Sequence, residues 1–215
     1  MRSFSFITIA TLLALTGCAG TTEKQKNAYL NQIRYNLSDT ASCCSSYADF
    51  DYITLNKTGS KEIDINSASQ AYTFKEGKSF FQAFKLPSAI AGYTVRLQTW
   101  NVIPDQSAFE NARFSFDPIV LFLDKDFTPI DHLQRFTMTH FESFTMNGRE
   151  ANFTLTGRRS KARYIVVYTN PKTVGTPLED QGGGMAEFNY IMNDLEDSRD
   201  ITRSSEGTIT ISIRR

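Results

Sequence analysis

The stretch "IVLFLDKDFTPI", residues 119–130, decides which fold the chain can adopt. The apolar run Ile119–Leu123 is typical of a strand that is buried on both faces. It leads into Asp124-Lys125-Asp126, which is followed by Phe-Thr-Pro. If these polar residues end a strand of a parallel sheet, the chain is an α/β protein. If they turn the chain back into an antiparallel neighbour, it is all-β.

The pattern D-x-D-x-T from Asp124 to Thr128 resembles the first motif of the haloacid-dehalogenase-type phosphatases, in which the first aspartate attacks phosphorus and the second is a general acid. The resemblance implies a parallel sheet, whose strands need crossover connections of about a dozen residues or more. After Thr128 the chain continues with Pro129 and another strand-like run, and no helical crossover follows. We therefore interpret Asp124–Asp126 as a turn, because an aspartate carboxylate bonds backbone N–H groups two residues on.

The segments around this turn favour strands of period two with short connections. Asn147-Gly148 separates two alternating runs and predicts a type I′ hairpin turn, and Gly157–Ser160 predicts a second turn. The strand-like segments are 74–86, 93–103, 112–123, 136–146, 149–156, 162–168 and 207–214. The prediction is an all-β, antiparallel, jelly-roll-like β-sandwich in a single domain over residues 41–215. Residues 171–206 are polar, glycine-rich and acidic, which is typical of a long functional or disordered excursion.

The N-terminus has the pattern of a bacterial lipoprotein. Arg2 precedes an apolar run, Phe4–Leu15, that is shorter than the ~20 residues needed to span a bilayer. Leu15-Thr16-Gly17-Cys18 then resembles a lipobox, which implies removal of a signal peptide at residues 1–17 and lipidation of Cys18. A plain secretory signal is the alternative. Ala19, in place of an aspartate, favours the outer membrane, with the protein facing the periplasm.

Residues 18–40 are predicted to be a lipidated tether, either a short amphipathic helix over about 24–37 or a disordered segment. Leu30, Ile33 and Leu37 recur at i, i+3 and i+7 and favour the helix. The anchored chain is thus expected to have the membrane as a partner without a transmembrane helix. The 23 basic and 23 acidic residues balance, and nucleic acid is not expected because it needs a basic patch.

Cysteines and histidines predict neither a metal nor a cofactor. Cys43 and Cys44 are adjacent, and a vicinal disulfide between them is one alternative in an oxidising periplasm. The other is a pair of half-buried thiols, since neighbouring Cα atoms are closer than most disulfides allow. His132 and His140 could join Glu142 as metal ligands, but half-exposed histidines without that role are the simpler interpretation.

Trp100, the only tryptophan, is a candidate for ligand binding. It is in register with Arg96 and Gln98, on the strand face opposite Val95 and Leu97. An aromatic face can stack on sugar C–H groups while the guanidinium and amide bond hydroxyls. A bulge that reverses the register, or a loop that covers Trp100, is the alternative.

The motifs taken together resemble the maltose operon periplasmic protein (MalM) family from about residue 41 to residue 215. The motifs are the paired Cys43-Cys44, FFQAFKLP at 80–87, DPIVLFLDKDFTPI at 117–130, ARYIVVYTN at 162–170 and GTITISI at 207–213. The resemblance implies a non-catalytic lipoprotein accessory to maltose or maltodextrin transport, with carbohydrate or envelope transport proteins as partners. The alternative is a general cell-envelope module that binds a protein or polysaccharide unrelated to maltose. A hydrolase is the third class.

Overall fold

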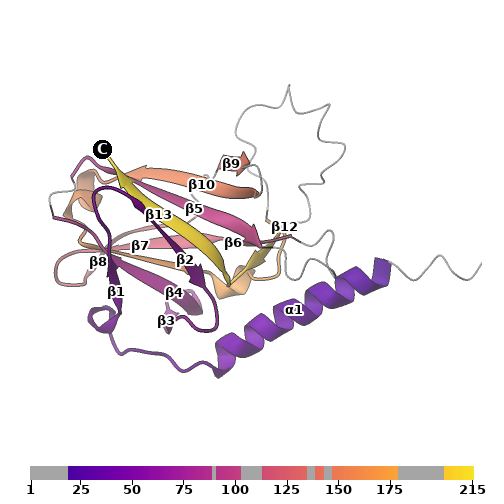
Figure 1. Ribbon diagram of the computed structural model, residues 1–215. Helices are drawn as coiled ribbons and strands as arrows, with labels where there is room; N and C mark the ends of the chain where they lie inside the picture. The colour runs from indigo at the N-terminus through magenta and orange to yellow at the C-terminus, as the bar shows by residue number, and fades with distance from the viewer. Residues whose placement is uncertain (1–18, 89–90, 103–112, 135–138, 143–146, 179–200) are drawn as a thin grey trace, which may run out of the picture.

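The computed structural model describes residues 19–88, 91–102, 113–134, 139–142, 147–178 and 201–215 (Figure 1). Two sheets pack face to face, and one long helix, α1 (Ala19–Asp39), lies beside them. This confirms the all-β sandwich with an N-terminal helix. The described ranges also contain three 3-10 helices: η1 (Tyr47–Asp49) precedes β1, η2 (Gly157–Lys161) lies between β10 and β11, and η3 (Pro171–Thr173) follows β11.

The first sheet has the strand order β1-β4-β11-β7-β8, with β3 paired to β4. Its strands are β1 (Tyr52–Thr54), β3 (Ala71–Phe74), β4 (Gly77–Lys85), β7 (Pro118–Leu123), β8 (Pro129–Leu133) and β11 (Tyr164–Thr169). The second sheet has the order β12-β6-β5-β10-β9, with β13 paired to β5 and β2 paired to β13. Its strands are β2 (Ser60–Ile65), β5 (Thr94–Val102), β6 (Arg113–Phe116), β9 (Thr139–Glu142), β10 (Asn147–Thr154), β12 (Ile201–Ser204) and β13 (Gly207–Arg214).

The core lies between the two sheets and follows the period-two pattern of the sequence. From the first sheet, β4, β7 and β11 contribute Phe80, Phe84, Val120, Phe122, Ile165 and Val167. From the second, β5 and β13 contribute Val95, Leu97, Ile209, Ile211 and Ile213. Each of these side chains is at most 3% exposed. Alternate residues of β7, namely Ile119, Leu121 and Leu123, are also buried, in a second cluster on the other face of the first sheet. This second cover explains why residues 119–123 are apolar without interruption.

Asp124 begins a tight turn between the antiparallel strands β7 and β8. Its Oδ1 atom accepts hydrogen bonds from the backbone N–H groups of Asp126 (2.9 Å) and Thr128 (3.0 Å). Phe127 has a φ of +59°, a conformation that is uncommon outside glycine. Its ring stacks on that of Tyr164 at a centroid distance of 4.5 Å, which helps to hold it there. Because β7 also pairs antiparallel with β11, the parallel sheet implied by the phosphatase motif is absent from this region.

Helix α1 packs against the sandwich through its second half. Leu30 and Ile33 are each 2% exposed and Leu37 is 8% exposed, so the i, i+3, i+7 stripe is the buried face. Arg34 donates from Nη2 to the carbonyl of Val174 at 2.9 Å. Lys78 donates from Nζ to the carbonyls of Ser38 (3.2 Å) and Thr40, which places a cation at the C-terminal end of the helix, where the dipole favours it. The second half of the predicted tether is thus docked on the domain.

Three details differ from the sequence-based expectations. The sheets are mixed, because β1 pairs parallel to β4 and β12 pairs parallel to β6. In both cases a long stretch of chain separates the two paired strands, and a long connection allows parallel pairing. The hairpin turn predicted at Asn147-Gly148 is wrong, since Asn147 pairs with Glu142 and Gly148 with Phe141 inside the ladder. The excursion predicted over 171–206 contains η3 and β12 at its ends, and residues 179–200 lie outside the described ranges.

Candidate functional site

The face of the second sheet that points away from the core is polar, and it carries all three predicted ligand-binding residues. Val95, Leu97 and Thr99 are buried, whereas Arg96, Gln98 and Trp100 are half-buried. The register of the sheet places Glu150 opposite Gln98 on β10 and Thr210 opposite Gln98 on β13. The strand alternation expected from the sequence is therefore present at Trp100, without a bulge that reverses it.

Glu150 links the polar side chains on this face. Arg96 donates from Nη2 to Oε2 of Glu150, and Gln98 donates from Nε2 to the same oxygen at 3.2 Å. Asn152 donates to the other oxygen, Oε1, at 2.9 Å. The hydrogen bond from Arg96, with that from Asn152, holds the pKa of Glu150 below its ordinary value although burial opposes this. Arg96 and Gln98 are thus pre-oriented by a carboxylate, as polar groups in a ligand site need to be.

Trp100 is fixed against the sheet by its indole nitrogen. Nε1 donates to Oγ1 of Thr210 on β13 at 3.1 Å. The cross-strand neighbour of Trp100 on β10 is Gly148, which is buried. A large ring beside a strand glycine is an arrangement known to stabilise sheets. The result is an aromatic ring with defined orientation beside Gln98 and Glu150.

Sequence reasoning missed Glu150 and Thr210. The alternation of GTITISIR does place Thr210 on a polar face. The hydrogen bonds of Gln98 with Glu150 and of Trp100 with Thr210, however, join residues 52 and 110 positions apart, and a local pattern cannot reveal them.

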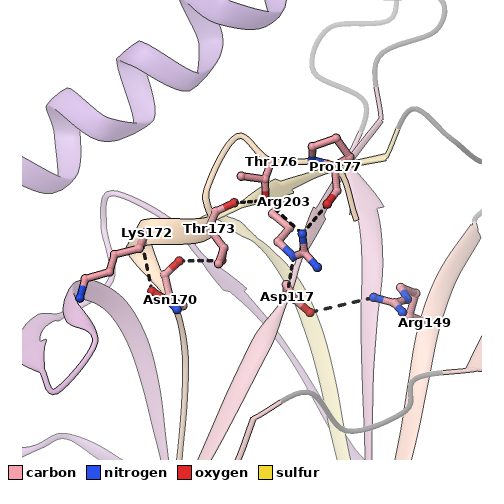
Figure 2. Close-up of polar contacts among 8 residues, drawn as sticks. All are labelled: Asp117, Arg149, Asn170, Lys172, Thr173, Thr176, Pro177 and Arg203. Carbon is pink, nitrogen blue, oxygen red and sulfur yellow. Dashed lines mark hydrogen bonds and ion pairs between the residues drawn. The ribbon is translucent and has the colours of Figure 1, made fainter. Parts of the chain in front are cut away.

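A second polar cluster surrounds Asp117, at the point where the chain passes from β6 in the second sheet to β7 in the first (Figure 2). Arg203 of β12 donates from Nε to Oδ2 of Asp117 at 2.8 Å, and Nη1 of Arg149 lies 4.0 Å from Oδ1. Arg203 also donates from Nη1 to Oγ1 of Thr176 (3.0 Å) and to the carbonyl of Pro177. This cluster ties the crossing point, β10 and β12 together, and its groups bond one another, so we assign it a structural role.

The remaining predicted sites are placed as follows. Residues 1–17 and Cys18 lie outside the described ranges. Cys43 and Cys44 are joined by a vicinal disulfide just before η1, and Cys44 packs on the outer cluster of the first sheet. His132 is exposed on β8, with Nε2 4.0 Å from Oε1 of Glu76, whereas the side chains of His140 and Glu142 are not described. In the described part of the chain, no three Asp, Glu, His or Cys side chains are grouped to hold a metal ion.

Within the same ranges, no helix is both long enough and apolar enough to cross a bilayer.

Comparison with protein families gives one match. Residues 76–179, just under half of the 215-residue chain, match the family model described as maltose operon periplasmic protein precursor (MalM). The matched range runs from the β3–β4 turn to the segment after η3, and so contains Trp100 and the Asp124 turn. No curated protein and no solved structure matches the chain.

The matched family is described as periplasmic and as part of the maltose operon, which supports a location of this chain in the cell envelope. The match over residues 76–179 thus confirms the resemblance to the maltose operon periplasmic protein (MalM) family that the sequence motifs predicted.

Proposed function

We propose that the protein is a lipid-anchored, non-catalytic accessory of maltose or maltodextrin transport, held on the outer membrane through Cys18 and facing the periplasm. The observation that carries the proposal is the MalM family match over residues 76–179. The lipobox Leu15–Cys18 supports the anchor. The antiparallel turn at Asp124 supports a non-catalytic role, because the one motif resembling a nucleophile has a structural function.

The ligand site of this proposal is the polar sheet face formed by Arg96, Gln98 and Trp100. Saccharide hydroxyls need both donors and acceptors, and Gln98 and Glu150 offer both beside the indole. Affinity is expected to be weak, since association alone costs several kcal/mol. A Kd near ~1 mM corresponds to about −4 kcal/mol, of which one stacked ring can supply a large share.

The test is an NMR titration of the mature chain carrying Cys18→Ser, which retains every described residue, with maltotriose. The indole N–H signal of Trp100 and the backbone amides of β5 and β13 should shift together. Trp100→Ala should remove the shifts of β5 and β13, Trp100→Phe should retain part of them, and Tyr35→Ala, an exposed aromatic on α1, should leave them unchanged. Shifts that persist in Trp100→Ala would move the site away from this face. Absence of any response at high millimolar sugar would favour an envelope module that binds a protein or another polysaccharide.

A further inference from the structure

The outer face of the first sheet carries a groove that the sequence did not indicate. Its volume is about 410 Å³, within the range of pockets that hold small ligands. Its floor is made by Leu121 of β7 and Tyr168 of β11, and its walls include Tyr47 of η1, Glu76 of the β3–β4 turn and Asp131 and His132 of β8. It lies on the sheet opposite the one that carries Trp100, so the two sites are separate.

The apolar part of the groove is rigid. Leu121 is 6% exposed and Tyr168 is 3% exposed, and the Tyr168 ring stacks on that of Phe74 at a centroid distance of 3.8 Å. Tyr47 is half-buried, and its ring is braced edge-on against Phe50, with the centroids 5.5 Å apart. The part of the Tyr47 ring that remains exposed is therefore held in place at the edge of the groove.

The Glu76 carboxylate at the groove is already oriented by protein groups. Glu76 accepts hydrogen bonds from the Tyr168 hydroxyl (2.8 Å) and from Nε2 of Gln134 (2.6 Å). Asp131 follows a different course: it pairs with Phe122, whose side chain lies in the core between the sheets, whereas His132 pairs with Leu121 of the groove floor. Its carboxylate therefore lies on the other face of β8, where it accepts from Nε of Arg159 at 2.5 Å. Because a carboxylate has about four acceptor positions, Glu76 can accept further hydrogen bonds from a ligand.

The groove is lined by charged side chains of both signs. Lys75 and Arg158 are exposed at its rim and supply donors, and the Glu76 carboxylate supplies an acceptor. An anionic ligand would face the Glu76 carboxylate, and a wholly apolar one would leave the exposed donors without partners. A neutral ligand with hydroxyl groups and apolar C–H faces fits all parts of the groove: its C–H groups can pack on the apolar floor and the Tyr47 ring, and its hydroxyls can bond the polar groups at the rim.

We infer that this groove binds a neutral saccharide unit and is a second sugar site, independent of the face that carries Trp100. The choice of saccharide class rests on the proposed function. The groove is concave, so it takes a single ring or a chain end.

The test uses maltotriose and the imidazole signals of His132, in the mature chain carrying Cys18→Ser. The chain has two histidines, so His132→Gln assigns the signals. We expect them to shift on titration, and to shift equally in Trp100→Ala. Tyr47→Ala should weaken this response about tenfold, the scale of one aromatic contact.

Because Tyr47→Ala also disturbs packing on Phe50, the double variant Lys75→Ala/Arg158→Ala provides a second measurement. It removes two exposed donors and should also weaken the response, while Tyr35→Ala should not. If the Trp100 signals shift and those of His132 do not, the groove inference is wrong and the proposed function stands. If neither set shifts, both are wrong. A His132 shift that all the groove variants retain would be unspecific and would also overturn the inference.

Discussion

Replacing Ile33 by alanine tests whether helix α1 is a structural part of the domain or only a connection to the membrane. Ile33 is 2% exposed on the buried stripe of the helix. The change removes three carbon atoms, worth about 0.8 kcal/mol each in lost burial, and leaves a cavity. We expect the free energy of unfolding to fall by about 2–4 kcal/mol, which corresponds to a decrease in Tm of about 4–16 °C for a chain of this size.

The measurement is urea unfolding of the mature chain carrying Cys18→Ser, followed by far-UV circular dichroism. Tyr35→Ala is the matched control, because Tyr35 lies on the same helix and is 63% exposed; it should change the unfolding free energy by less than about 0.5 kcal/mol. If Ile33→Ala costs no more than this control, the helix does not contribute to the folded domain, and residues 19–39 act as a tether alone.

Three further outcomes are expected. Cys18→Ser should release the protein from membrane fractions, and a variant that still sediments with membranes after a high-salt wash would place the anchor elsewhere. Asp124→Ala should lower the unfolding free energy by about 1–2 kcal/mol, because two backbone N–H groups lose their acceptor. Asp124→Asn should lower it by less than about 0.5 kcal/mol. Magnesium-dependent phosphatase turnover that disappears in Asp124→Asn would contradict the non-catalytic role. Burial raises the pKa of Glu206 above its unfolded value, so its contribution to stability is present at acid pH and is lost as the pH rises through the folded pKa. In urea unfolding, Glu206→Gln should therefore be more stable than the native chain at pH 7 and equal to it near pH 4. An equal difference in unfolding free energy at both pH values would show that charge is not the cause.

The sandwich could be predicted because its strands show their burial in the local pattern. Val95 and Leu97 alternate with polar residues, and the continuous run 119–123 marks a strand covered on both faces. The Asp124 turn could be predicted for the same reason, since its hydrogen bonds join residues at most four apart.

What could not be predicted depends on contacts between distant segments. Leu30 is buried by Phe114 and Val174, and the sequence near the helix contains neither. The groove needs Tyr47, Glu76 and Tyr168 to meet across three elements. Asn147-Gly148 has the sequence of a hairpin turn, but Gly148 lies within strand β10 and pairs with Trp100 of β5. Local turn propensity was overruled there by the pairing of whole strands.

If the chain is anchored through Cys18, as we propose, the docked helix limits how far the domain can stand from the bilayer. A flexible segment of the same 21 residues would have an end-to-end distance of about 25 Å and would let the domain point in any direction. The helix instead fixes its second half to the sandwich, and the part before Tyr29 adds a length of about 15 Å at 1.5 Å per residue. With the lipid attached at Cys18, as we propose, the domain is held at a short standoff and in a narrow range of orientations. Soluble sugar can reach it from any side, but a protein partner must itself lie at the membrane surface.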